Sequence, residues 1–200
     1  LSSQGESQDL LMKAAGLGLS LTRMTLDSAL GKLGEPVIRK ALVEALGIMG
    51  RQFVLGRSIE EGLKNAGAYH KKGYRLSYDM LGEGARTRED AERYFESYRH
   101  ALEEIGKVPA AAEKMRDGLS VKLSALHPRY SAAQESDCVP ALTEKLRVLA
   151  VLAARSNTPL TVDAEEVDRL ALSLAIIGNT MEDPALSGWE GFGLAVQAYQ

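Results

Sequence analysis

Four strand-like segments in the sequence alternate apolar and polar residues, and each has one polar residue at a comparable position. These polar residues are Asp79, Lys122, Asp163 and Gln197. Lys122 lies between Val121 and Leu123, and burying a lysine is costly unless it is paired or used in chemistry. We therefore expect an internal ion pair between Lys122 and Asp163, in a site wall formed by the four polar side chains.

Acidic residues cluster in PLTVDAEEVD (159–168), directly after the third of these segments. Such a cluster is either the wall of a site or the first turn of the next helix, where the helix dipole favours negative charge. Asp163 is in register with the strand, which favours its assignment to the wall of a site. Glu165, Glu166 and Asp168 fit either interpretation equally well.

From residue 73 onward, strand-like segments alternate with amphipathic helices. We expect strands over 74–81, 119–126, 160–165 and 191–199, and helices opening at Thr87 and covering 138–155 and 170–177. Parallel strands need a crossover connection, so this alternation predicts a parallel sheet and an α/β fold.

The faces of the expected strands distinguish between two α/β folds. Each strand has one apolar and one polar face, whereas both faces of a doubly wound sheet lie under helices and should be apolar. A (β/α)8 TIM-type barrel instead turns one face toward its axis, and its active site lies at the carboxyl ends of the strands. Four units make half of a barrel, so we expect residues 73–200 to be its first part and the chain to continue beyond Gln200.

Residues 1–72 read as a helical arm or linker that precedes the barrel. Pro36 to Phe53 has apolar residues near helical spacing, with proline in the first turn, where no backbone donor is needed. Ser58 can cap a second helix that ends near Gly67.

Composition limits the classes of function. The net charge of -3 gives no reason to expect nucleic-acid binding, and Cys138, the only cysteine, has no partner for a disulfide. The three histidines show no metal-ligand spacing, and neither a dinucleotide fingerprint nor a P-loop is present. No apolar run approaches the roughly 20 residues that span a bilayer. We expect a cytoplasmic protein.

Four segments together resemble the proline dehydrogenase domain of the bacterial bifunctional proline utilization A enzymes. They are SYDMLGE (77–83), SVKLSALHPRY (120–130), VDAEE (162–166) and GFGLAVQAYQ (191–200). The resemblance implies an FAD-dependent barrel that oxidises L-proline to Δ1-pyrroline-5-carboxylate, the first step of proline catabolism to glutamate. It also implies hydride transfer from proline C5 to flavin N5, a membrane quinone as electron acceptor, peripheral membrane association, and fusion to an NAD-dependent L-glutamate-γ-semialdehyde dehydrogenase.

The resemblance also assigns roles to residues. Lys122 and Asp163 line the pocket between flavin and proline, and Asp163, Ala164, Ala195 and Gln197 lie beside the flavin. Asp79 and Met80 border the substrate, and Glu83 matches an acid that pairs with a carboxylate-binding arginine. That arginine and the FAD adenosine site lie beyond Gln200. The proton of the proline amine goes either to Asp163 or to water.

Two other classes of function stay open. A cofactor-free barrel lyase or aldolase would use Lys122 to form a Schiff base. A non-catalytic interaction scaffold would need none of these polar residues for chemistry. The sequence does not decide whether the protein forms a homo-oligomer.

Overall fold

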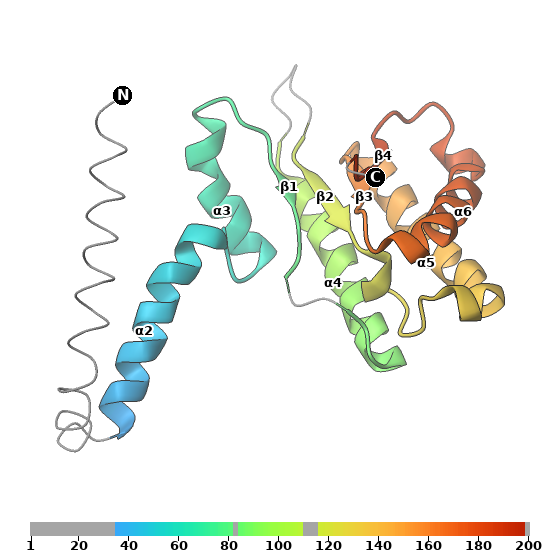
Figure 1. Ribbon diagram of the computed structural model, residues 1–200. Helices are drawn as coiled ribbons and strands as arrows, with labels where there is room; N and C mark the ends of the chain where they lie inside the picture. The colour runs from blue at the N-terminus through green and yellow to red at the C-terminus, as the bar shows by residue number, and fades with distance from the viewer. Residues whose placement is uncertain (1–34, 82–83, 110–115, 199–200) are drawn as a thin grey trace. The chain divides into compact units, whose positions relative to one another are not determined.

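The computed structural model describes residues 35–81, 84–109 and 116–198 (Figure 1). The chain divides between Leu55 and Gly56 into two compact units. In the first unit, helix α2 (Glu35–Phe53) agrees with the helix expected from Pro36 to Phe53. Val37, Leu42, Val43 and Leu46 of this helix are exposed. The domain boundary expected between residues 72 and 73 stays a prediction.

Four short parallel strands form the sheet of the second unit. They are β1 (Ser77–Tyr78), β2 (Gly118–Val121), β3 (Leu160–Val162) and β4 (Phe192–Leu194). The strands lie side by side in chain order, and Leu119 pairs with Leu160, which pairs with Phe192. The predicted parallel α/β sheet is therefore confirmed.

Helix α3 (Ile59–His70) precedes β1. The helices that connect successive strands are α4 (Arg88–Lys107), α5 (Glu135–Ser156) and α6 (Leu170–Met181). Ser58 caps α3 as expected, accepting a hydrogen bond from the Glu61 backbone N–H. Thr87 and Asp90 form the reciprocal capping box that opens α4. Asn157 ends α5 in the left-handed conformation, with φ of 50°.

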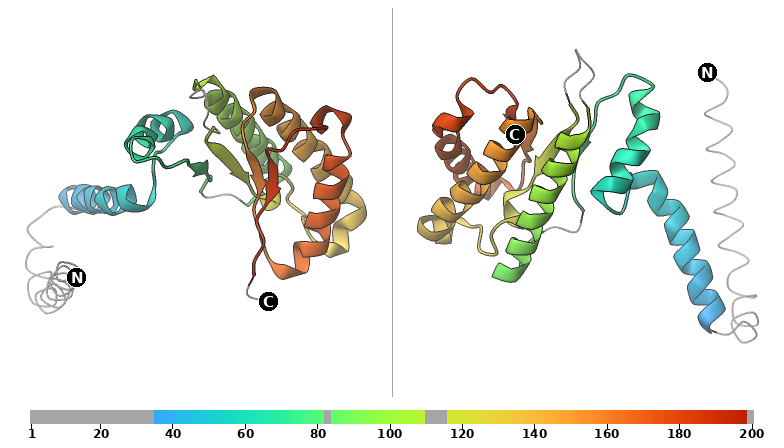
Figure 2. Two further views of the ribbon diagram at one scale, coloured as in Figure 1. Left: turned by 90° about the horizontal axis from the view of Figure 1, so that it is seen from above. Right: turned by 180° about the vertical axis from the view of Figure 1, so that it is seen from behind.

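One face of the sheet carries the hydrophobic core. Leu119, Val121, Leu160 and Val162 are buried, and they belong to the same apolar cluster as Tyr98 of α4 and residues of α5. The view from behind shows α4 and α5 in front of this face of the sheet (Figure 2). Strand side chains alternate, so the residues between these apolar ones point to the opposite face.

The strands are shorter than the sequence indicates. The segment expected as a strand over 119–126 leaves the sheet after Val121 and forms a 3-10 turn, Leu123–Ala125. Leu123 and Ala125 are nevertheless buried. The alternating pattern was misleading because a 3-10 turn returns the same apolar residues to the core.

Helix α6 continues through Gly178 and Asn179, where the sequence suggests its end. The Thr180 hydroxyl donates to the Ile176 carbonyl at 2.8 Å, and Ile176, Ile177 and Thr180 are buried. Burial of this turn outweighs the cost of about 1 kcal/mol that a glycine imposes on a helix.

The described sheet is open, so its closure into a barrel stays a prediction. Its strand order has no reversal, whereas a doubly wound sheet reverses its order at a switch point. Among the described residues, no helix combines the length and hydropathy needed to cross a bilayer.

Candidate active site at the carboxyl ends of the strands

The register of β2 and β3 brings Lys122 and Asp163 together. Val121 pairs with Val162, and the Asp163 N–H donates to the Val121 carbonyl at 2.9 Å. Both valines point into the core, so the next residue on each strand points to the opposite face. Lys122 and Asp163, which follow the paired valines, therefore lie side by side on the polar face.

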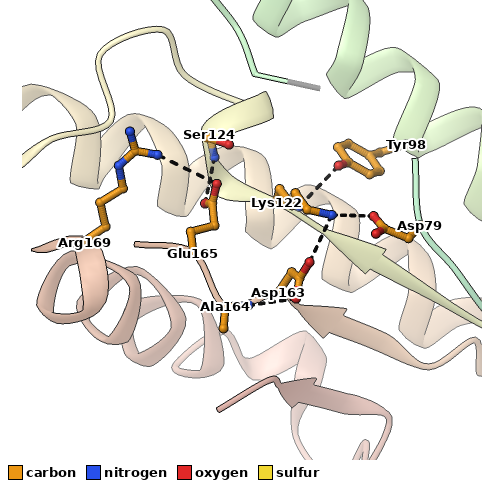
Figure 3. A network of polar contacts seen from close by, with 8 residues as sticks. All are labelled: Asp79, Tyr98, Lys122, Ser124, Asp163, Ala164, Glu165 and Arg169. Carbon is orange, nitrogen blue, oxygen red and sulfur yellow. Dashed lines mark hydrogen bonds and ion pairs between the residues drawn. The ribbon is translucent and has the colours of Figure 1, made fainter. Parts of the chain in front are cut away.

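The predicted ion pair is present, and a second carboxylate joins it (Figure 3). Lys122 Nζ lies 3.0 Å from Asp163 Oδ2 and 2.6 Å from Asp79 Oδ1. The Lys122 side chain is 24% exposed, against 29% for Asp163 and 44% for Asp79. The network is thus open enough for a ligand to reach it. One ammonium shared by two carboxylates leaves a local excess of negative charge.

Backbone contacts hold these side chains in place. The Lys122 N–H donates to the hydroxyl of Tyr98, a buried residue of α4, at 3.3 Å. The other oxygen of Asp163, Oδ1, accepts the Ala164 N–H at 2.9 Å. Lys122 is therefore anchored to a core helix, and both carboxylate oxygens of Asp163 are engaged.

The other predicted site residues have different positions. Ala195 lies level with Asp163, because its N–H donates to the Val162 carbonyl at 2.9 Å. Met80 is half-buried against the core, whereas Gln197 has an exposed side chain beyond the end of β4. Glu83 lies outside the described residues. The structure thus places Asp79 and Asp163 beside the Lys122 ammonium, with Ala164 and Ala195 alongside.

Glu165 makes contacts that the sequence did not reveal. Its Oε2 accepts the Ser124 N–H at 3.1 Å, and its Oε1 lies 3.8 Å from Nη1 of Arg169 (Figure 3). The exposed neighbour Glu166 pairs with Arg169 at 3.0 Å. The helix-dipole interpretation is insufficient for Glu165, but no local signal indicated that its carboxylate would bind another strand's loop.

The HPRY segment lines a cavity of about 680 Å3 beside this network. Its walls include His127, Arg129, Tyr130 and Arg169. Burial lowers the pKa of His127 and raises the pKa of Tyr130 to about 12. The Arg169 guanidinium lies 5.2 Å from the centre of the Tyr130 ring. The segment thus forms part of a pocket wall, and Tyr130 is also part of the core.

Comparisons with known proteins agree with the resemblance in the four segments. Residues 62–200 match the family model for proline dehydrogenase. The chain is 43% identical to the bifunctional protein PutA of Escherichia coli and 41% identical to that of Rhizobium meliloti, in each case over 98% of the chain. It spans only 16% and 17%, respectively, of those two relatives.

Solved structures give the same result. A crystal structure of a mutant of Bradyrhizobium japonicum proline utilization A (PutA) aligns with a TM-score of 0.67 and 49% identity, covering 85% of this chain and 17% of that one. PutA from Bdellovibrio bacteriovorus, at 21% identity, aligns with a TM-score of 0.75 over 82% of this chain and 18% of its own, which supports the fold alone. The chain belongs to the proline dehydrogenase family.

Proposed function

We propose that the protein oxidises L-proline to Δ1-pyrroline-5-carboxylate at the polar face of the sheet, with FAD as hydride acceptor and a membrane quinone as the final acceptor. The observation that carries the proposal is the position of Lys122. Its ammonium is held between Asp79 and Asp163 where β2 and β3 end. Active sites of β/α barrels lie at this end of the strands.

The charge of the network suits an amino-acid substrate. Lys122 and the two aspartates carry more negative than positive charge. The secondary ammonium group of proline would offset this excess, while its carboxylate would pair with the arginine expected beyond Gln200. Oxidation of the C5–N bond removes one proton from the ammonium nitrogen and a hydride from C5, which leaves the product as its protonated imine. Carboxylates close to the substrate amine therefore suit both binding and the chemistry.

The described residues also suit a planar cofactor. Gly193 and Ala195 follow the polar face of β4, and a Cβ added at Gly193 would meet no atom closer than 3.9 Å. Together with Ala164, these small residues leave room for a flat ring beside Asp163. When bound, FAD supplies the hydride acceptor.

The chain's own residues would position the reactants and stabilise charge. The Lys122 ammonium would stabilise negative charge that develops on the acceptor during hydride transfer. Asp79 and Asp163 keep that ammonium in place, and Met80 and Ala164 shape the apolar wall of the pocket. Gln197 would contact the acceptor ring, and Glu83 would pair with an arginine that binds the proline carboxylate.

Further parts of the proposal concern the intact protein. Residues 1–72 would form the arm, and residues 73–200 would begin a (β/α)8 barrel that continues beyond Gln200. A downstream L-glutamate-γ-semialdehyde dehydrogenase domain would use NAD. The PutA relatives, which are described as bifunctional, support this arrangement.

The Schiff-base alternative is disfavoured by the same geometry. A lysine attacks a carbonyl group only after its ammonium loses a proton, and the two carboxylates beside Lys122 favour the charged form. Borohydride treatment in the presence of a carbonyl substrate should therefore leave Lys122 unmodified, which mass spectrometry of its peptide would show.

The direct test uses the intact protein, L-proline and a dye as electron acceptor. We expect Δ1-pyrroline-5-carboxylate to form, detected as its coloured adduct with o-aminobenzaldehyde, and the purified protein to show flavin absorbance near 450 nm. A protein that carries flavin yet forms no product from L-proline would refute the proposed substrate. A protein without flavin would refute the proposed cofactor.

A further inference from the structure

The loops that follow three strands meet at the Ser124 peptide, beside the polar contacts of Lys122 (Figure 3). The Ser124 N–H donates to Glu165 after β3, and the Ser124 carbonyl accepts the Ala85 N–H, after β1, at 2.9 Å. Ser124 itself follows β2. The Glu165 carboxylate therefore completes a link across the loops that leave β1, β2 and β3.

This link includes the backbone of Lys122. The Ala125 N–H donates to the Lys122 carbonyl at 3.1 Å, which closes the 3-10 turn around Ser124. A shift of Ser124 would therefore move the Lys122 peptide and change where its ammonium lies relative to Asp79 and Asp163. Strand β2 ends at Val121, and none of the strand pairs in the described part of the chain extends to this turn.

Glu165 is well placed to hold Ser124, because its side chain is mostly covered and a neighbouring arginine fixes its carboxylate. Its side chain is only 11% exposed, and Arg169 faces its second oxygen. The Tyr130 hydroxyl donates to the Arg169 carbonyl at 3.4 Å, which anchors the Arg169 backbone to the core. A largely covered carboxylate that accepts a backbone N–H and forms an ion pair with a guanidinium has a defined position.

We propose that Glu165 is a positioning residue that acts through the Ser124 N–H on the Lys122 ammonium, a role that rests on the proposed function of Lys122. The reach of the side chain is the decisive property, and its negative charge is secondary. Glu166 is the natural control because it pairs with the same arginine, whereas the Ser124 N–H donates to Glu165.

Two conservative substitutions separate reach from charge. Glu165→Gln keeps the length and an oxygen that can accept the Ser124 N–H, whereas Glu165→Asp keeps the charge but is one methylene too short. Glu166→Asp is the matched shortening at the control position. For each variant of the intact protein, we would measure kcat and KM for L-proline and the amide hydrogen exchange of residues 122–126.

We expect Glu165→Asp to lower kcat about 10-fold, because a misplaced catalytic group loses transition-state stabilisation. KM should change by less than about two-fold, since charge on the acceptor develops only in the transition state. Exchange at Ser124 should become faster. Glu165→Gln should lose distinctly less activity, and Glu166→Asp should behave as the unmodified protein does.

Three results would overturn the proposal. The first is a larger loss in Glu165→Gln than in Glu165→Asp, which would make charge decisive. The second is faster exchange in Glu165→Asp without a change in kcat, which would make the link purely structural and leave the proposed function intact. The third is normal turnover in Lys122→Met, which would reject the role of Lys122 as well. Should Glu165→Asp fail to fold, a loss in Glu165→Gln as large as that in Lys122→Met would decide against the proposal.

Discussion

Polar groups gather at both ends of the sheet, around a carboxylate at the amino end and around an ammonium at the carboxyl end, but the two clusters differ in how far they are exposed to solvent. At the amino end, Asp117 accepts the Leu76 N–H at 2.9 Å and the Tyr78 hydroxyl at 3.0 Å, and it pairs with His70 at 2.8 Å. Its side chain is 9% exposed. At the carboxyl end, Lys122 and its two aspartates remain open to solvent.

The contrast indicates different roles. Burial and the charge of Asp117 raise the pKa of Tyr78, so the tyrosine remains a neutral donor to that carboxylate. The Asp117 carboxylate is thus satisfied by the Leu76 N–H, the Tyr78 hydroxyl and the His70 ring, and it joins α3 to β1 and β2. In β/α barrels, the amino end of the strands serves stability and the carboxyl end serves catalysis. The comparison predicts that mutations at the two ends will affect different properties.

The largest effect is expected at the carboxyl end. Lys122→Met should lower kcat by about 10²- to 10³-fold, the loss typical when one donor that stabilises developing charge is removed. The control is Lys145→Met, because Lys145 is also 24% exposed and also forms an ion pair, with Glu92 at 3.0 Å, but on the outer helices. Steady-state kinetics would give kcat for both variants. Equal losses of kcat would contradict a catalytic role that belongs to Lys122 and not to Lys145.

Asp117→Ala should mainly reduce stability. It leaves the Leu76 N–H and the Tyr78 hydroxyl without their acceptor, at a cost of about 2 to 3 kcal/mol. Native-state hydrogen exchange of the β1 and β2 peptides would report this as a lower free energy of local opening. Glu92→Ala, which breaks an exposed pair, should change that free energy by less than about 1 kcal/mol. A normal opening free energy in Asp117→Ala would contradict the assignment of the amino end to stability.

The smallest effect is expected for Glu60, at the other end of α3. Hydrogen bonds from the Ser58 side chain, the backbone N–H and His100 hold its pKa at about 2, below the usual 4.5. A lowered pKa stabilises the fold above pH 4.5, and this contribution is lost as the pH falls from 4.5 toward 2.

Glu60→Gln therefore should be less stable than the unmodified protein at pH 6, with the difference shrinking below pH 4.5. Thermal unfolding across this pH range would measure it, with the exposed Glu182→Gln as the control. A constant difference down to pH 2 would show that titration of Glu60 does not contribute.

Local patterns predicted the elements and the central ion pair, because both depend on alternation within short segments. Lys122 between two apolar residues, and Asp163 in register on the next strand, were sufficient to place the pair. The involvement of Asp79 in that pair and the contact from Glu165 to Ser124 were not predictable in this way. They depend on how far each chain segment turns after its strand ends, which the flanking residues do not encode.

The same limit applies to the strand ends. A 3-10 turn and a β-strand both bury Leu123 and Ala125, so the sequence could not distinguish them. At the amino end, Asp117 had no strand-like context, and its partners His70 and Tyr78 come from segments far away in sequence. Polar residues outside a periodic pattern become interpretable only when the fold brings their partners together.

The most direct test asks whether the substrate occupies the polar face beside Lys122. Acetylation of Lys122 and Lys145 in the intact protein would be followed by mass spectrometry, with and without saturating L-proline. The account predicts that L-proline slows acetylation of Lys122 and leaves Lys145 unchanged. Equal rates at Lys122 with and without L-proline would contradict the placement of the active site at the carboxyl ends of β2 and β3.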